Sequence, residues 1–372
     1  MIIITSHASL IDGKIYDALT NNFIEILQKN KMDFIFIRHS IDGKLPSTIY
    51  NYHKGKNISR KNLVVFSKIA PLRYISEIIS TFIYFLHKKY DVRICYIGVD
   101  PLNAFTGVLL KKVSKIDKVI FYTADYSKKR FSNKILNYLY HTVDRYCVKN
   151  VDEVWNVSSR IRDVRKNMGL IDSKNIFLPN VPSDEYKNYT TNKKNKYHLI
   201  TLGVIGDQLD FIGIFDSIKD LKIKFPQILL TIVGNGPKEE EYIQYVKING
   251  LENNVKFLGY LSHNQALEEI SKSGIGLALY NGNWNFNYYG DSVKCREYFS
   301  FGLPVITTDS HSTVEEIKEN QAGIVCNMNK DDYIRAILDI IGNYEKYSRN
   351  SYCLSQKYEN IHSRLLKSMD NK

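Results

Sequence analysis

Residues 288–309 read YYGDSVKCREYFSFGLPVITTD, and this stretch indicates the class of fold. Asp291 and Ser292 have side-chain oxygens that suit the cap of a helix, because an oxygen there accepts hydrogen bonds from first-turn amides. Gly302 suits the end of that helix, and the β-branched run at 304–308 is typical of a buried strand. The stretch therefore predicts a capped helix followed by a strand of a parallel sheet.

Lys294 and Glu297 lie one helical turn apart within this stretch. Side chains at that spacing share one face of a helix, so the cation and the carboxylate would both point toward whatever lies at the helix start. Two interpretations are open, a ligand site and a solvated surface ion pair. The local pattern favours the ion pair, because such pairs are far commoner on helices than ligand sites.

Length and composition restrict the class of protein. The 372 residues are enough for two domains, and 44% hydrophobic with 24% charged residues is typical of a soluble globular chain. The most apolar segment, near 78–86, has about half of the roughly 20 residues that a membrane-spanning helix needs. Residues 1–5 lack the basic region of a signal peptide. We therefore expect a cytoplasmic protein.

The cysteine pattern and the net charge limit which ligands and partners the chain could bind. The five cysteines are scattered and odd in number, which indicates neither a disulfide framework nor a zinc site. The formal net charge of +12 favours an anionic partner, and nucleotide phosphate, an anionic lipid surface and nucleic acid all fit. No recognised nucleic-acid motif is present, so we expect no nucleic-acid partner.

Strand and helix patterns alternate along the chain. A polar segment at 184–196 predicts a linker between an N-terminal domain, 1–183, and a C-terminal domain, 197–345, with a bracing helix at 346–372. Strands are predicted at 1–5, 34–38, 93–98, 119–123, 153–157, 199–203, 228–234, 255–258, 275–279, 304–308 and 323–325, and residues 175–178 close the first half. Helices are predicted at 16–29, 71–89, 103–115, 133–149, 212–224, 239–248, 265–273 and 313–319, with a further one capped by Ser158 or Ser159. The polar, lysine-rich sequence around 63–66 is interpreted as loop.

This alternation implies parallel sheets with right-handed crossovers, so we expect an α/β protein with two doubly wound domains in tandem and a cleft between them. Ligands of such sheets bind beyond the carboxyl ends of the strands. Glycine turns stand there at Gly203 with Gly206 and at Gly234 with Gly236. Glycine lets backbone amides approach a phosphate, although a tight turn without a ligand explains each motif equally well. Glu239 replaces the third glycine of a dinucleotide fingerprint, which argues against a nicotinamide or flavin site.

Three segments of the second half match one family in order and spacing. They are 232–237 (IVGNGP), 255–261 (VKFLGYL) and 291–308. Together they resemble the retaining glycosyltransferases of the GT-B fold, particularly the large family 4 group. The resemblance covers most of 197–325 and implies two Rossmann-like domains with a nucleotide-sugar donor, whereas the first half matches in architecture and loop positions.

The resemblance implies a role for each part of the second-half site. Gly259 and Tyr260 would lie beside the nucleotide base, and Glu297 would accept hydrogen bonds from the ribose hydroxyls, since a carboxylate binds a vicinal diol bidentately. The helix start at 292–294 would face the diphosphate, because a helix N-terminus with a lysine suits phosphate charge. The expected donor-binding residues are Gly203, Gly206, Gly234, Asn235, Gly259, Tyr260, Asp291, Ser292, Val293, Lys294 and Glu297.

The chain departs from the family pattern at three positions. Tyr289 replaces the first of two family glutamates, and Val204 and Asp210 stand about where an arginine and a lysine are usual. Neutralisation of the diphosphate would therefore depend on Lys294, on backbone amides or on a cation from the first half.

The first half supplies candidates for the acceptor side. Asp125 follows a strand, in the loop where many relatives carry a histidine or an aspartate near the reacting sugar, and we expect it to be the catalytic polar group. A cap or turn residue is the alternative. His7 and Gly13, in a predicted loop at 6–13, and Arg160, after a strand, are expected on the acceptor or phosphate side. A solvated loop histidine and a surface arginine are the alternatives.

The resemblance implies transfer of a hexose from a nucleotide-diphosphate sugar to a glycan or lipid-linked acceptor, with retention, in cell-surface polysaccharide or glycoconjugate synthesis. No Asp-x-Asp pair follows a strand, so we expect neither a metal ion nor another cofactor. A nucleotide-sugar epimerase of the same architecture and a basic nucleic-acid-binding protein are the alternatives. The helix at 71–89 fits contact with an anionic membrane, but its helical spacing favours core packing.

Overall fold

The chain forms two compact units, Met1–Leu178 together with Ile361–Lys372, and Pro179–Asn360. The division at Leu178 comes before the predicted linker at 184–196. Most of that linker and nearly all of the predicted tail beyond 358 lie outside the described residues. The computed structural model describes residues 1–11, 13–16, 18–67, 69–182, 186–187, 189, 194–281, 285–358 and 361.

A nine-stranded sheet organises the first unit. Its strands are β1 (Ile2–Ile11), β2 (Lys14–Tyr16), β3 (Phe34–Ser40), β4 (Thr48–His53), β5 (Lys56–Asn62), β6 (Cys95–Val99), β7 (Lys118–Thr123), β8 (Glu153–Asn156) and β9 (Asn175–Phe177). The order is β5-β4-β3-β1-β6-β7-β8-β9, with β2 paired to β1. The parallel strand order reverses between β1 and β6, and ligands of doubly wound sheets bind at such a reversal.

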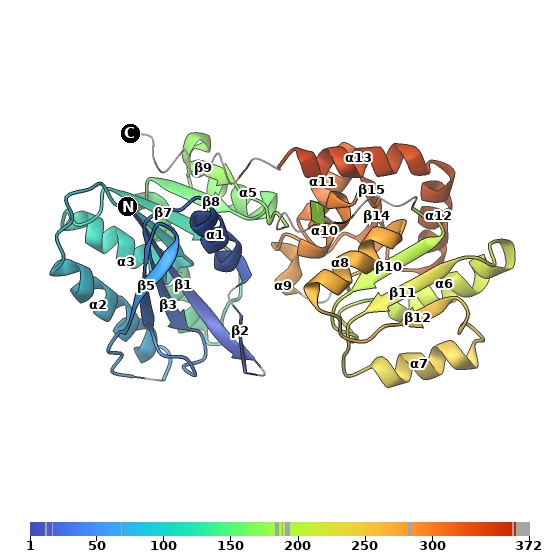
Figure 1. The fold of residues 1–372 in the computed structure, drawn as a ribbon, viewed down its shortest axis with the longest axis horizontal. Helices are drawn as coiled ribbons and strands as arrows, with labels where there is room; N and C mark the ends of the chain where they lie inside the picture. Colours follow the sequence, from blue (N-terminus) through green and yellow to red (C-terminus); the bar gives the residue numbers. More distant parts are fainter. Residues whose placement is uncertain are drawn as a thin grey trace. The chain divides into compact units, whose positions relative to one another are not determined.

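Helices cover both faces of this sheet (Figure 1). α2 (Leu72–Leu86), α3 (Pro101–Lys112) and α4 (Lys134–Asn150) lie side by side on one face, and α1 (Ala18–Lys29) lies on the other. α5 (Ser159–Asn167) and the 3-10 helix η1 (Asp172–Lys174) connect β8 to β9. Ser158 caps α5, as predicted, because its side chain accepts from the amide of Ile161.

Two predicted loops of the first unit contain strands. Residues 6–11 continue β1, which pairs with β3 as far as Ala8 and then with β2. The polar sequence before 63 contains the antiparallel hairpin of β4 and β5, and β5 is exposed along its whole length. An exposed edge strand carries polar residues on both faces, so it shows no period-two pattern in the sequence.

The predicted core packing of α2 holds for only part of the helix, since Phe85 lies in the core and Phe82 packs against it. Its apolar residues Ile75 and Ile79 are exposed, whereas Arg73 and Glu77 are buried against the sheet. Phe85 is the apolar residue of this helix that the core buries fully. Helical periodicity reports an amphipathic helix correctly, but it does not say which face turns inward.

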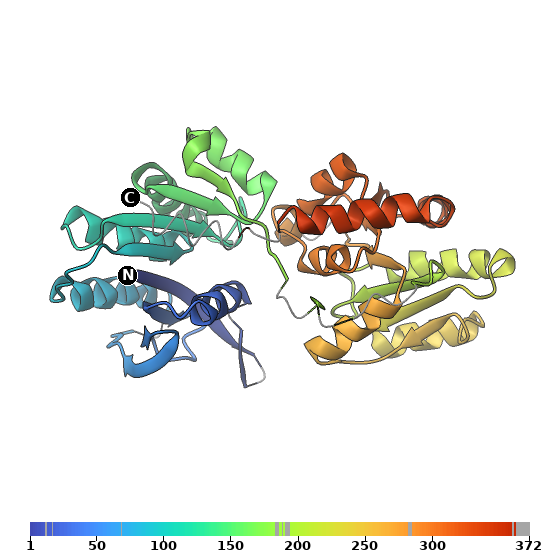
Figure 2. The same cartoon turned by 45° about the horizontal axis from the view of Figure 1, so that its top comes forward.

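A six-stranded parallel sheet organises the second unit (Figure 2). Its strands are β10 (His198–Leu202), β11 (Leu229–Val233), β12 (Val255–Phe257), β13 (Ile275–Ala278), β14 (Val305–Thr308) and β15 (Gly323–Cys326). The order β12-β11-β10-β13-β14-β15 reverses between β10 and β13. The loops after these two strands therefore mark the expected ligand-binding edge.

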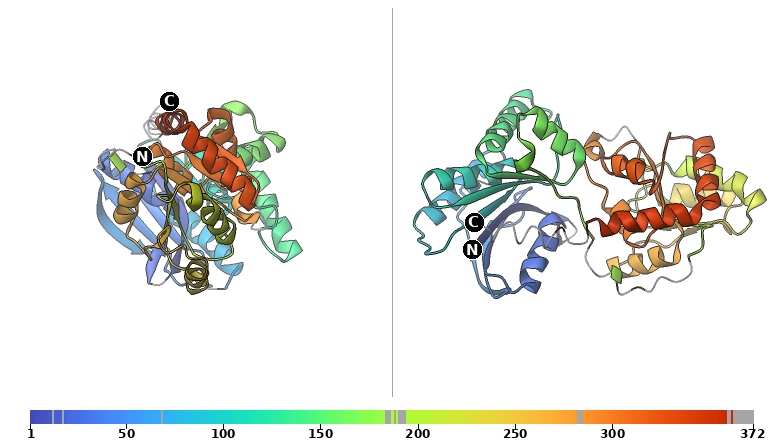
Figure 3. Two further views of the ribbon diagram at one scale, coloured as in Figure 1. Left: turned by 90° about the vertical axis from the view of Figure 1, so that its right-hand side faces the viewer. Right: turned by 90° about the horizontal axis from the view of Figure 1, so that it is seen from above.

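Seven of the eight helices described in the second unit cover the two faces of this sheet, which Figure 3 shows from two further directions. α6, α7 and α12 pack on one face, and α8, α10, α11 and α13 pack on the other. Among the described residues, no helix combines the length and the apolar character needed to cross a bilayer. The helices are α6 (Phe211–Lys224), α7 (Glu239–Ile248), α8 (His263–Lys272), α9 (Asn285–Tyr288), α10 (Val293–Ser300), α11 (Thr313–Asn320), α12 (Lys330–Gly342) and α13 (Tyr344–Gln356).

Candidate functional site

Three glycine turns meet at the carboxyl ends of β10, β11 and β12. The amide of Gly203 donates to the carbonyl of Val233 at 2.9 Å, and the amide of Gly234 donates to the carbonyl of Gly259 at 2.8 Å. A Cβ on Gly234 would lie 1.9 Å from the carbonyl oxygen of Gly203, so these backbones approach more closely than a side chain allows. The turns form an edge made largely of backbone.

Lys294 lies against the first of these turns. Its ammonium donates to the carbonyl of Leu202 at 2.5 Å and lies 4.7 Å from the ring centroid of Tyr280. A Cβ on Gly203 would lie only 3.2 Å from this ammonium, so the glycine leaves room for it. Burial lowers the pKa of Lys294 to about 8, although Cys295 and Glu297 partly oppose the shift. In the described part of the chain, no carboxylate forms an ion pair with this lysine.

α10 presents its first turn beside Lys294. Ser292 caps the helix by accepting from the amide of Cys295, as predicted. The amide of Ser292 donates to the hydroxyl of Thr313 at 2.9 Å, and its own hydroxyl lies 3.2 Å from that of Tyr280. The chain after α10 turns at Gly302, whose φ of +64° lies in the left-handed region that favours glycine.

Glu297 pairs with a histidine that the sequence did not single out. Its Oε1 lies 3.0 Å from Nε2 of His263, which is the first residue of α8, and the Glu297 side chain is 14% exposed. Lys294 and Glu297 are not paired with each other, so the interpretation of these two residues as a surface ion pair is wrong. A capping box of Ser262 and Gln265 fixes the start of α8 and thereby the position of His263. That capping pattern, directly after Gly259 and Tyr260, is the signal that could have found it.

Asp291 supports the start of α10 from within the unit. Both its oxygens accept from Arg296, at 2.7 to 3.1 Å, and Oδ2 also accepts from the amide of Asn180 at 2.7 Å. Arg296 also pairs with Glu316, whose other oxygen accepts from the hydroxyl of Tyr358. This cluster is buried, so Asp291 has a structural function here, and its contact with a donor stays a prediction.

The remaining predicted donor residues lie in the same group of turns. The carbonyl of Asn235 accepts from the amide of Ile205, one residue before Gly206, at 2.9 Å. Tyr260 is 67% exposed directly after the turn at Gly259, and Val293 is 52% exposed at the start of α10. Of the two residues that stand where the family usually has cations, Val204 is exposed and Asp210 caps α6.

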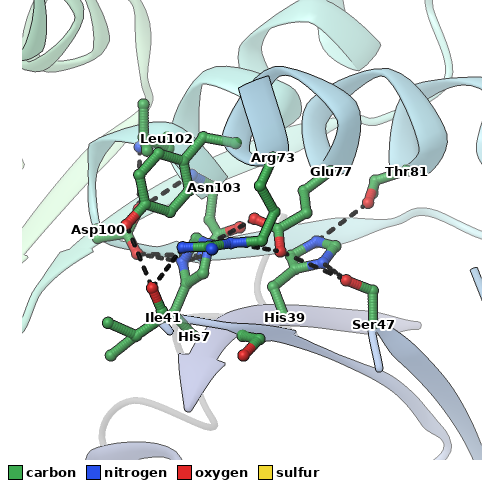
Figure 4. A network of polar contacts seen from close by, with 12 residues as sticks. His7, His39, Ile41, Ser47, Arg73, Glu77, Thr81, Asp100, Leu102 and Asn103 are labelled. Atoms are coloured by element: carbon green, nitrogen blue, oxygen red, sulfur yellow. Dashed lines mark hydrogen bonds and ion pairs between the residues drawn. The ribbon is translucent and has the colours of Figure 1, made fainter. Parts of the chain in front are cut away.

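A second polar cluster lies at the strand reversal of the first unit (Figure 4). His7 lies on β1, with Nδ1 at 2.7 Å from Asp100 and Nε2 at 3.0 Å from Glu77 of α2. Its side chain is 8% exposed, so the interpretation of His7 as a solvated loop histidine is wrong. Burial lowers the pKa of His7, but the two carboxylates outweigh this effect and raise the pKa to about 10. His7 is therefore a buried imidazolium at neutral pH.

Asp100 holds His7 from a strained position. Its backbone has φ 75° and ψ 165°, a combination that residues other than glycine rarely adopt and that costs about 1–3 kcal/mol. Oδ1 accepts from the amides of Leu102 and Asn103, so the side chain also caps α3. An aspartate between a strand and Pro101 is the sequence signal for this cap.

His39, beside His7, stays neutral. Burial lowers its pKa well below the usual value, and the charge of His7 lowers it further. Its ring nitrogens lie 2.9 Å from the hydroxyl of Ser47 and 3.2 Å from that of Thr81. Figure 4 shows Glu77 and Thr81 reaching inward from α2 toward the two histidines.

The other first-unit candidates lie in two loops and in the first turn of a helix. Asp125 follows β7, is 57% exposed and pairs with Arg130 at 2.5 Å. Asn133, rather than Asp125, caps α4, so the cap interpretation of Asp125 is wrong. Arg160 lies in the first turn of α5, and Gly13 lies at the exposed turn between β1 and β2 with a φ of +74°. Among the described residues, no group of histidine, cysteine, aspartate and glutamate could hold a metal ion.

Residues 182–352 match the family described as "Glycosyl transferases group 1". The matched segment lies within the second unit and contains the glycine turns, Lys294 and Glu297. A comparison with curated protein sequences finds no match.

Solved structures similar to the whole chain include several glycosyltransferases. HepE of Anabaena in complex with UDP has a TM-score of 0.65 at 13% identity, with 100% of both chains covered. WaaG, a glycosyltransferase involved in lipopolysaccharide biosynthesis, has a TM-score of 0.63 at 13% identity, also with 100% of both chains covered. The lipopolysaccharide outer core galactosyltransferase WaaB has a TM-score of 0.65 at 15% identity, with 98% of this chain and 100% of that chain covered. These likenesses confirm the predicted α/β fold of GT-B type.

The buried imidazolium of His7 predicts a pH dependence of stability. Because its folded pKa of about 10 lies above the usual 6.5, its contribution is fully present below about pH 6.5 and is lost as the pH rises through about 10. Between about pH 7 and pH 9, unfolding releases a proton, so the free energy of unfolding falls with pH. We expect His7→Gln to flatten this slope in urea unfolding.

The exposed His53 provides the matched control, and His53→Gln should keep the wild-type slope. Equal slopes for wild type and His7→Gln would contradict a charged His7.

Proposed function

We propose that this chain transfers a hexose from a nucleotide-diphosphate sugar to a hydroxyl of a glycan or lipid-linked acceptor, with retention of configuration. The observation that supports this most is Lys294, a lysine without a carboxylate partner in the described part of the chain, at the strand reversal of the second unit. The match of 182–352 to glycosyl transferases group 1 supports the same reaction.

In this proposal, the diphosphate binds at the start of α10. The ammonium of Lys294 and the positive end of the helix both favour phosphate oxygens. The glycines at 203 and 234 bring backbone close to the same place without side chains in the way. As the glycosidic bond breaks, negative charge grows on the leaving phosphate, and the same groups stabilise it.

The nucleoside binds beside Glu297. Its carboxylate accepts hydrogen bonds from the two ribose hydroxyls, and His263 positions it from the neighbouring helix. Tyr260, which is exposed after the turn at Gly259, stacks on the base in this proposal. UDP is the first nucleotide to test, because HepE was solved with UDP and with UDP-glucose.

The acceptor binds through the first unit. Asp125 orients the acceptor or stabilises the developing positive charge, and Arg130 pairs with its carboxylate. His7, Gly13 and Arg160 are assigned to the acceptor or phosphate side. The leaving phosphate accepts the acceptor proton, so the step requires no strong protein base and, in this proposal, no metal ion.

A panel of nucleotide sugars tests the reaction class. The full-length chain is incubated with each donor, with and without oligosaccharide and lipid-linked acceptors, and the products are identified by mass spectrometry. We expect transfer or slow hydrolysis with one class of donor. Absence of transfer, hydrolysis and thermal stabilisation with every nucleotide would reject the proposal, and epimerisation of a donor alone would favour the epimerase.

Removal of the Glu297 carboxylate tests the nucleoside site. Glu297→Ala should weaken donor binding by about tenfold or more, because hydrogen bonds to a charged group contribute roughly 1.5–3 kcal/mol each. The thermal midpoint without ligand should stay near that of wild type. Affinity is measured by calorimetry with the donor that the panel identifies.

Glu319→Ala is the matched control, since Glu319 is exposed on α11. An unchanged donor affinity in Glu297→Ala would show that the nucleoside binds elsewhere.

A further inference from the structure

The helix α2 packs with its polar face inward. Arg73, Ser76, Glu77 and Thr81 are each at most 4% exposed. Glu77 pairs with His7, and Thr81 contacts His39, so the inward face completes the polar cluster at the strand reversal. A charged face normally turns toward solvent, and here the cluster keeps it inside.

The opposite face of α2 carries an apolar stripe. It consists of Leu72, Ile75, Ile79, Ile83 and Leu86, which recur at three and four residues and are between 37% and 54% exposed. This spacing places all five along one side of the helix. Isolated apolar side chains on a surface need no explanation, but a continuous stripe marks an interaction surface.

The segment before α2 extends this surface. Val64, Phe66 and Ile69 are between 64% and 82% exposed. Two serines of α2 hold the segment in place, because the hydroxyl of Ser76 accepts from the amide of Phe66 at 2.8 Å and that of Ser80 donates to the carbonyl of Val64. The apolar residues of the segment and of the helix therefore belong to one fixed patch, here named the α2 patch.

Basic residues flank the α2 patch at both ends. Lys88 and Lys89 follow the cap residue His87 of this helix and are exposed, and Lys115 donates to the carbonyl of Lys88 at 3.2 Å. Upstream, the exposed strand β5 carries Arg60 and Lys61 and leads into the residues at 63–67. Apolar residues between clusters of lysine and arginine are the pattern of a helix that lies in the headgroup region of an anionic bilayer.

We propose that the α2 patch docks this chain on a membrane surface that contains anionic lipids. The apolar stripe enters the boundary between headgroups and acyl chains, and the flanking basic residues contact the lipid phosphates. A second copy of the chain fits less well, because a symmetric contact would bring the same positive charges together. This inference is independent of the proposed sugar transfer.

Vesicle flotation tests the docking. Full-length protein is mixed with phosphatidylcholine vesicles or with vesicles in which about a third of the lipid is phosphatidylglycerol. We expect flotation with the anionic vesicles and weaker flotation at high salt, because screening weakens the lysine contacts. The variant Ile75→Ser, Ile79→Ser, Ile83→Ser should lose binding by about tenfold or more, since three apolar side chains no longer leave water.

A matched control removes three exposed isoleucines elsewhere, with Ile171→Ser, Ile223→Ser and Ile248→Ser, and should float like wild type. Both variants change exposed side chains, and equal thermal midpoints verify their folding. Failure of wild type to float, equal flotation with neutral vesicles, or undiminished flotation of the α2 variant would overturn the proposal. A dimer of wild type that the α2 variant loses, without flotation, would assign the patch to self-association instead.

Discussion

The candidate site of the second unit depends on a single lysine ammonium held against a backbone carbonyl. Lys294 donates to Leu202 at the end of β10, and Gly203 is the residue that leaves space for it. The ammonium lies against the ring of Tyr280 and, within the described residues, has no carboxylate partner. Burial therefore lowers the pKa of this lysine. Such a group gains free energy from any anion that approaches it, and the start of α10 adds partial positive charge at the same place. The buried cluster of Asp291 and Arg296 then fixes the helix that carries this lysine.

Much of the fold could be predicted from the sequence, because buried parallel strands are nearly continuous apolar runs and the helices between them begin at recognisable caps. The elements that were not predicted correctly are those whose polar and apolar residues do not reflect contact with the core. β5 is polar on both faces, and β1 continues past Thr5 because β3 and β2 offer it partners. α2 was predicted with its apolar residues in the core, but the polar cluster takes the inward face, so Ile75 and Ile79 are exposed and Phe85 alone is fully buried among the apolar residues of this helix. Periodicity contains no information about which face finds a partner distant in sequence.

The candidate site was only partly predictable for a related reason. Residues within one motif, such as Ser292 and Lys294, could be placed because the helix cap fixes them locally. His263 and Asp100 were missed because their partners, Glu297 and His7, are distant in the sequence and meet them only when the sheets form. The glycine turns were recognised singly, but the contact of Gly203 with Gly234, which explains both, depends on the order of the strands.

The measurement that tests this account most directly is the pKa of Lys294, followed by NMR of protein with 13C at the lysine side chains. Lys294→Arg assigns its signal. The account predicts a lysine that titrates near 8 in the free protein and whose pKa rises when a nucleoside diphosphate binds, since the phosphate favours the charged form. A Lys294 signal with an ordinary pKa, or one that a bound nucleotide leaves unchanged, would contradict the account.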